Sequence, residues 1–246
     1  MATETDRLPV VAIVGPTATG KSKLAVELAL AVGGEVVSCD STAVYRGFDI
    51  GTDKPSIMDR RGVPHHLIDI IEPTSSYSAA RYAVDASTVI TDIVGRGVLP
   101  ILVGGSGLYY RALTRGFFPG PGRNDKLRGR LATFASRRGV TALHRLVKRV
   151  DPDSAIRIQP RDEKRLIRAL EVYFLTGRPL TAHFANTQSP LSSYKVISFG
   201  LRLTPEETAK RVACRVDEQF DRGLLDEIRA VLRSGCLLYT SDAADE

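Results

Sequence analysis

The sequence GPTATGKS at residues 15–22 decides the fold. It matches G-x-x-x-x-G-K-[ST], follows a short apolar run at Pro9 to Val14, and precedes apolar residues at helical spacing from Lys21 to Val32. Glycines let such a loop fold so that successive backbone N–H groups and the N-terminus of the next helix point at one anion. The sequence therefore predicts a strand, a phosphate-binding loop and a helix, with a di- or triphosphate as the ligand.

Every residue of this loop is a candidate ligand of the phosphates. Lys21 adds a positive charge, and the Ser22 hydroxyl is a candidate ligand of Mg²⁺, which we expect as the cofactor. The candidates for diphosphate or nucleotide binding are Gly15, Pro16, Thr17, Ala18, Thr19, Gly20, Lys21 and Ser22.

Short apolar runs alternate with helical patterns outward from the loop, and Ser78 to Val94 is the clearest helix. This alternation predicts an α/β fold, a P-loop NTPase-like doubly wound parallel sheet with ligands at the carboxyl ends of its strands. The further predicted strands are Glu35 to Cys39, His66 to Ile71, Val98 to Val103 and Tyr194 to Leu203.

The core is expected to be discontinuous in sequence. Gly116 to Gly122, with two prolines, breaks the α/β pattern, and the helix after the last strand should begin with Thr204 as its N-cap and Pro205 at its first position. The predicted parts are 8–115 and 194–235 for the core, 116–193 for a mainly helical insertion, and 236–246 for a separate tail.

Positive charge is concentrated in the insertion. Residues 123–168 carry fourteen Lys or Arg against five Asp or Glu, a net charge of +9, whereas the whole chain carries +6. Lys and Arg displace counterions from phosphates, so this excess indicates a polyanionic partner. The alternative is an ordinary solvated helical surface.

Composition excludes several other classes of protein. No stretch is long and apolar enough to span a membrane, and Met1 to Arg7 is too polar for a secretion signal, so we expect a cytoplasmic protein without membrane association. Three scattered cysteines give neither a disulfide framework nor a zinc site.

The phosphate loop alone does not decide between two reactions. A kinase would hold ATP there and transfer the terminal phosphoryl group, whereas a prenyltransferase would hold an allylic diphosphate and stabilise its departure. Asp40 ends the second predicted strand, next to the loop, and is the candidate base for an attacking amine. Position alone leaves it equally suited to bind a Mg²⁺ water or to accept a substrate hydroxyl.

Several longer motifs resemble the tRNA dimethylallyltransferases in order and approximate spacing. The resemblance extends from about Pro9 to about Gly235. Besides GPTATGKS, the motifs are DSTAVYRGFDIGTDKP at Asp40 to Pro55, YSAA at Tyr77 to Ala80, VGGSGLY at Val103 to Tyr109, and DEKRLIRALEVY at Asp162 to Tyr173.

The resemblance implies transfer of a dimethylallyl group from dimethylallyl diphosphate to N6 of the adenine 3′ of the anticodon, in tRNAs that read codons beginning with U. Asp40 would be the base, with Thr19 and Lys21 as further catalytic residues, and the insertion of a monomeric enzyme would hold the tRNA anticodon stem-loop. The implied tRNA-binding residues are Asp40, Ser41, Thr42, Ala43, Ser106, Arg128, Lys164, Arg165, Leu166, Ile167 and Arg168.

Structural alternatives stand beside these roles. The basic residues of the 164–168 segment share one helical face and could form only a salt-bridged surface, while Ser106 could simply cap a helix. Tyr45 and Tyr109 could stack on bases or pack in the core. Many family members have Gln in place of Ala43 and Ala in place of Asp53, so an amide contact is missing and an extra negative charge lies near the expected tRNA path.

Two other functions remain open at this point. A P-loop kinase of a nucleoside or small metabolite would need ATP and no tRNA, with the basic insertion as its lid. An RNA-binding protein with a regulatory nucleotide site would bind tRNA without turnover.

The end of the chain departs from the family pattern. Cys236 to Glu246 (CLLYTSDAADE) matches nothing in the family and corresponds to translated DNA that resembles a transposase-type sequencing adapter. We expect this tail to be non-native and the enzyme to be truncated, the alternative being a divergent C-terminus.

Overall fold

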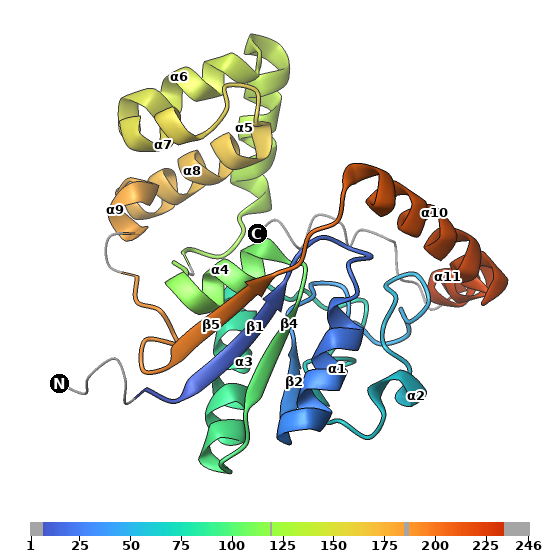
Figure 1. The fold of residues 1–246 in the computed structure, drawn as a ribbon. Coiled ribbons are helices and arrows are strands. Elements are labelled where there is room, and N and C mark those ends of the chain that lie inside the picture. Colours follow the sequence, from blue (N-terminus) through green and yellow to red (C-terminus); the bar gives the residue numbers. More distant parts are fainter. Residues whose placement is uncertain (1–6, 119, 185–186, 234–246) are drawn as a thin grey trace. The chain divides into compact units, whose positions relative to one another are not determined.

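The computed structural model describes residues 7–118, 120–184 and 187–233 (Figure 1). They form two compact units: one extends to Gly116 and resumes at Ser189, and the other spans Phe117–Gln188. The bounds of the second unit are close to those of the insertion that we expected over 116–193. The predicted non-native tail, 236–246, lies outside the described residues.

The first unit is built on a five-stranded sheet in which all the pairings are parallel. The strand order is β3-β2-β4-β1-β5, which confirms the predicted doubly wound α/β class. The strands are β1 (Pro9–Val14), β2 (Glu35–Ser38), β3 (His65–His66), β4 (Pro100–Gly104) and β5 (Lys195–Gly200).

Helices cover both faces of this sheet, as Figure 1 shows. On one face, α1 (Lys21–Val32) packs Ala25, Val26 and Ala29 against alternate strand residues such as Ile13 and Val103. Successive strand residues point to opposite faces, so the intervening buried residues form the core under α3 (Ala79–Gly95), which in turn packs on α4 (Gly107–Arg115). This double cover explains why β1, β2 and β4 are buried and largely apolar on both sides.

The register brings three strand ends to one edge of the sheet. Val14 pairs with Gly104, and Ser38 pairs with Val103, so the segments that follow β1, β2 and β4 emerge side by side. Gly104 is required there, because a Cβ at this position would lie 2.0 Å from the carbonyl oxygen of Cys39. The phosphate loop, Asp40 and Ser106 are therefore neighbours.

The prediction of a strand over 66–71 is wrong for most of its length. Only His65–His66 pairs with β2 as a strand, and Leu67 and Asp69 have φ angles of +61° and +56°. Residues in left-handed conformations interrupt the hydrogen bonding of an extended strand. The segment pairs again only through one isolated parallel bridge, between Tyr45 and Ile71.

The remaining helices of this unit are α2 (Ile57–Arg60), α10 (Pro205–Asp221) and α11 (Leu224–Arg233). The predicted start of α10 is confirmed: Thr204 caps it and forms a capping box with Glu207, and Pro205 occupies the first turn. Among the residues that the structure describes, no helix is both long and apolar enough to cross a membrane.

The second unit is entirely helical in its described part. Its core is formed by buried side chains from four of its helices, among them Leu131, Leu143, Ala155 and Leu166. The helices are α5 (Asp125–Arg138), α6 (Val140–Val150), α7 (Pro152–Arg157), α8 (Glu163–Thr176) and α9 (Leu180–Phe184).

The buried carboxylate of Glu35 forms an ion pair with Arg96 at the other end of the sheet, away from the phosphate loop. Glu35, at the first position of β2, accepts hydrogen bonds from Arg96 at 2.5 and 2.8 Å, and His66 Nε2 lies 2.7 Å from it. The hydrogen bonds from Arg96, aided by His66, outweigh burial and lower the pKa of Glu35 to about 2.

We predict that Glu35→Gln lowers the free energy of unfolding at pH 7 by about 2 kcal/mol. The pKa of Glu35 is lower in the folded state, so its stabilisation is present above the unfolded pKa and is lost as pH falls from about 4.5 towards about 2. Urea denaturation at several pH values measures this. The gap between wild type and variant should shrink below pH 4.5, while Glu72→Gln, in an exposed pair with Arg46, should change little at any pH.

Candidate active site

The phosphate loop connects β1 to α1 and leaves the first turn of α1 open to an anion. Gly20, the N-cap residue, has φ +85°, and no side chain caps the helix. The first N–H groups of α1 therefore lack a side-chain acceptor and point out of the helix end. A diphosphate would satisfy these donors.

Lys21 lies inside this loop. Its Nζ donates to the carbonyl oxygen of Pro16 at 2.5 Å and lies 3.4 Å from Thr19 Oγ1. Partial burial lowers the pKa of Lys21, Asp40 opposes this effect, and Arg215 adds to it. The ammonium group therefore lies against oxygens of the phosphate loop itself.

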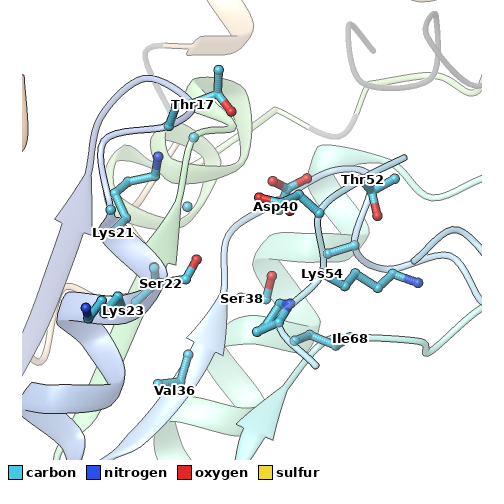
Figure 2. A pocket seen from close by; sticks show the side chains of 18 of the residues that line it. Thr17, Lys21, Ser22, Lys23, Val36, Ser38, Asp40, Thr52, Lys54 and Ile68 are labelled. Carbon is cyan, nitrogen blue, oxygen red and sulfur yellow. The ribbon is translucent and has the colours of Figure 1, made fainter. Parts of the chain in front are cut away.

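A cavity of about 570 Å³ opens in front of the loop. Figure 2 shows Lys21 and Ser22 on one side of it and Asp40, Thr52 and Lys54 on the other. The sequence-predicted phosphate ligands and the predicted base therefore face one shared space.

Asp40 follows β2 and is held in a turn by its own neighbour. Its Oδ1 accepts hydrogen bonds from the backbone N–H of Thr42 at 2.8 Å and from Thr42 Oγ1 at 2.7 Å. These bonds fix the orientation of the half-buried carboxylate at the edge of the cavity. A carboxylate held in this way can accept a proton from a group bound in the cavity.

Ser106 ties the segment after β4 to the segment after β2. It occupies the N-cap position of α4, but its side chain does not cap that helix. Instead, Ser106 Oγ accepts a hydrogen bond from the Ser41 backbone N–H at 2.8 Å and lies 3.1 Å from Ser41 Oγ. Ser106 thus occupies the N-cap position, as the structural alternative expected, but its side chain makes no capping hydrogen bond. It instead holds the chain beside Asp40 in place.

The two tyrosines that could have stacked on bases are packed in the core instead. Tyr45 and Tyr109 are buried, and Tyr109 stacks on Tyr82 with ring centroids 4.3 Å apart. The Tyr82 hydroxyl donates to the carbonyl oxygen of Ser38, so this buried stack supports the strand end that leads to Asp40.

Sequence reasoning missed two arginines on α10. Arg215 donates to Thr17 Oγ1, Arg211 donates to the carbonyl oxygen of Ala18 at 3.4 Å, and both line the cavity. Because they lie four residues apart, they share one face of α10. That spacing was visible in the sequence, but the long separation from the phosphate loop gave no reason to place them there.

The donors for Mg²⁺ are few. Within the described part of the chain, no three His, Cys, Asp or Glu side chains gather in a way that could hold a metal. Ser22 Oγ and Asp40 line the same cavity. This set fits Mg²⁺, which is commonly held by one or two protein oxygens together with substrate phosphates and waters.

The predicted tRNA-binding residues of the second unit differ in exposure and in their partners: some are buried, some face solvent, and two bind a buried carboxylate. Leu166 and Ile167 are buried in the core, so any contact that they make with RNA would come from their backbone. Lys164 and Arg165 face solvent. Apolar residues in the middle of an amphipathic helix such as α8 are expected to face the core.

Arg128 and Arg168 are tied to a buried carboxylate, Glu171. Arg128 donates to it at 2.9 and 3.0 Å, Arg168 donates at 2.6 Å, and the backbone N–H of Asn124 adds a bond at 2.8 Å. Burial alone would raise the pKa of Glu171, but these hydrogen bonds lower it. Two guanidinium groups thus bind one buried carboxylate at this position.

Comparison with known proteins supports the geometry. The family model described as IPP transferase matches residues 43–244, and one described as isopentenyl transferase matches residues 8–67. The tRNA dimethylallyltransferase of Thermomicrobium roseum is 48% identical over 230 residues, which cover 93% of this chain and 69% of that protein. The Geobacter metallireducens tRNA dimethylallyltransferase is 46% identical over 94% of this chain and 75% of its own.

Solved structures give the same result. The full-length tRNA isopentenylpyrophosphate transferase of Bacillus halodurans aligns with a TM-score of 0.63 and 41% identity, over 94% of this chain and 72% of that one. A eukaryotic dimethylallyltransferase acting on tRNA aligns with a TM-score of 0.73 and 29% identity, over 92% and 56%.

We predict that Glu171→Gln destabilises the helical unit by about 2 to 3 kcal/mol, because it removes the buried negative charge that Arg128 and Arg168 share. Unfolding in urea, together with hydrogen exchange of the α8 amides, measures the effect. The matched control is Asp125→Asn, whose exposed pair with Arg123 should contribute less than about 1 kcal/mol. Equal stability of Glu171→Gln and wild type would show that the buried carboxylate is dispensable.

Proposed function

The chain belongs to the IPP transferase family, and we propose that it transfers the dimethylallyl group of dimethylallyl diphosphate to N6 of the adenine 3′ of the anticodon in tRNA. The proposed tRNAs are those that read codons beginning with U, as the family resemblance implies. The observation that carries the chemistry is the shared cavity, in which the phosphate loop with Lys21 faces Asp40.

The reaction forms one bond and breaks one. The N6 lone pair attacks the first carbon of the allylic chain, and the bond between that carbon and the diphosphate oxygen breaks. The exocyclic amine is a weak nucleophile because its lone pair is delocalised into the ring, so Asp40 accepts the proton as the new bond forms. The diphosphate leaves with the electron pair of the broken bond.

Leaving-group stabilisation falls to the phosphate loop. The N–H groups at the start of α1 lack a side-chain cap, and Lys21 would exchange its bond to the Pro16 carbonyl oxygen for one to the departing diphosphate. Thr19 lies beside Lys21 and, as the family resemblance implies, would contact a phosphate or the adenine amine. Arg211 and Arg215 approach the outer side of the same loop and add positive charge there.

A bound Mg²⁺ would neutralise part of the diphosphate charge. Ser22 would hold it, as the residue that follows the loop lysine in motifs of this type.

RNA binding is assigned chiefly to the helical unit. Its net positive charge and the exposed Lys164 and Arg165 support a role in holding tRNA phosphates. Asp40 to Ala43 and Ser106, beside the cavity, would meet the flipped adenine. Ala43 is buried, so its part in such a contact would come from the backbone.

The other two functions are not favoured. The relatives are named as transferases acting on tRNA, and a kinase reading has no such support. Binding without turnover is disfavoured because the site carries both the anion-binding loop and a carboxylate across from it. A cytoplasmic location and a monomeric state stay predictions.

We predict that Lys21→Ala and Asp40→Ala both reduce prenyl transfer to tRNA by at least about a hundredfold, for different reasons. Lys21→Ala should also weaken binding of dimethylallyl diphosphate, whereas Asp40→Ala should still bind it. Transfer of radiolabel from dimethylallyl diphosphate to tRNA and calorimetry with the diphosphate separate the two effects.

The wild-type protein is assayed in parallel with tRNA and radiolabelled ATP. Phosphoryl transfer from ATP without prenyl transfer would support the kinase function over the prenyltransferase function. Near-normal turnover by Asp40→Ala, with diphosphate binding intact, would remove that carboxylate from the role of base.

A further prediction concerns the exposed basic face of α8. Arg165→Glu should weaken tRNA binding and lower the slope of log affinity against log salt concentration by about one, because phosphate contacts produce that slope. Filter binding over a salt series measures it. Arg229→Glu, a similarly exposed arginine on α11, is the control. Identical slopes for Arg165→Glu and wild type would assign Arg165 to a solvated surface only.

A further inference from the structure

Arg215 reaches the phosphate loop from a helix that lies almost 200 residues further along the chain, and one acidic side chain holds it in place. Its guanidinium group donates to Thr17 Oγ1, and its Nε lies 3.3 Å from Asp53 Oδ2. Asp53 Oδ1 lies 3.6 Å from a second guanidinium, that of Arg222. Asp53 therefore connects α10 to the edge of the cavity, which it also lines.

The backbone around Asp53 is fixed by several independent bonds. Glu227 of α11 accepts hydrogen bonds from three successive N–H groups, those of Asp49, Ile50 and Gly51, at 2.7 to 2.9 Å. Gln219 of α10 donates to the carbonyl oxygen of Ile50 at 2.9 Å. Asp53 itself has φ +53°, a left-handed conformation that the surrounding bonds must maintain.

The next residue, Lys54, anchors the same loop from inside. Its side chain is buried, and its Nζ binds Asp49 and Asp69 as well as the carbonyl oxygen of Tyr45. The backbone that carries Asp53 is thus held by bonds that do not involve the Asp53 side chain.

An ordinary surface ion pair would contribute little here. Arg215 differs from that case because its side chain is only 25% exposed and is shared between Asp53 and the phosphate loop. It also lies near enough to Lys21 to lower the pKa of that side chain. A long cation held in this way needs no further ordering when an anion binds, which removes part of the entropic cost of binding.

We propose that Asp53 is a positioning residue for diphosphate binding: it holds Arg215 over the phosphate loop, and Arg222 offsets the negative charge that Asp53 brings. The proposal rests on the diphosphate site proposed above. On this proposal the Asp53 carboxylate selects the orientation of a cation and does not act as a repulsive charge.

The test measures diphosphate binding separately from turnover. Asp53→Asn keeps the size of the side chain and tolerates the left-handed backbone, but it removes the charge that attracts Arg215. Calorimetry with inorganic pyrophosphate should show about fivefold weaker binding, and the KM for dimethylallyl diphosphate should rise by a similar factor with kcat nearly unchanged. Asp92→Asn, which breaks an exposed pair with Arg96, is the matched control and should change neither quantity.

A double-mutant cycle distinguishes positioning from a general charge effect. Arg215→Met alone should weaken pyrophosphate binding more than Asp53→Asn does, and adding Asp53→Asn to it should have no further effect. Unchanged or tighter pyrophosphate binding by Asp53→Asn, or additive losses in the double variant, would overturn the proposal. Absence of prenyl transfer by the wild type would instead count against the proposed function, and the pyrophosphate data would still decide the role of Asp53.

Discussion

The close approach of Gly104 to the carbonyl oxygen of Cys39 is the contact on which the rest of the site depends. No residue with a Cβ fits there without moving β2 or β4 apart. With glycine present, the parallel register carries the ends of β1, β2 and β4 to one edge, so that an anion-binding loop, a carboxylate and a serine hydroxyl meet. A sheet that was wider at this point would keep its core and separate Lys21 from Asp40.

Around that edge, three cations each donate to a neutral oxygen of the phosphate loop, and Arg215 is held in addition by Asp53. Lys21 and Arg211 bind backbone carbonyl groups of the phosphate loop itself, and Arg215 binds a threonine hydroxyl of the same loop. A diphosphate offers these cations stronger, charge-assisted hydrogen bonds than neutral oxygens do. In the helical unit the opposite arrangement occurs, because Arg128 and Arg168 bind a buried carboxylate that no ligand would displace.

Much of the fold could be predicted because its decisive signals are local. The phosphate loop, four of the five strands and the capped start of α10 each depend on residues that are neighbours in sequence. The strand predicted after residue 66 failed because its apolar residues lie on a chain that turns through left-handed conformations at Leu67 and Asp69, and nothing in the pattern indicates those turns. Arg215, Glu171 and Glu227 were not recognised, since their partners are distant in sequence and each could equally have been an ordinary charged surface residue.

The same physical reasoning explains why the loop alone left the reaction open. Backbone N–H groups and a lysine recognise a diphosphate whether it remains on the enzyme as a leaving group or gives up a phosphoryl group. The choice depends on what stands opposite the loop, and here that is a carboxylate with an orientation fixed by Thr42, on a segment fastened to α4 through Ser106. A carboxylate at the edge of an open cavity suits an acceptor brought in from outside, such as a nucleobase flipped from an RNA loop. The role proposed for the helical unit, with its concentration of positive charge, is to hold that RNA.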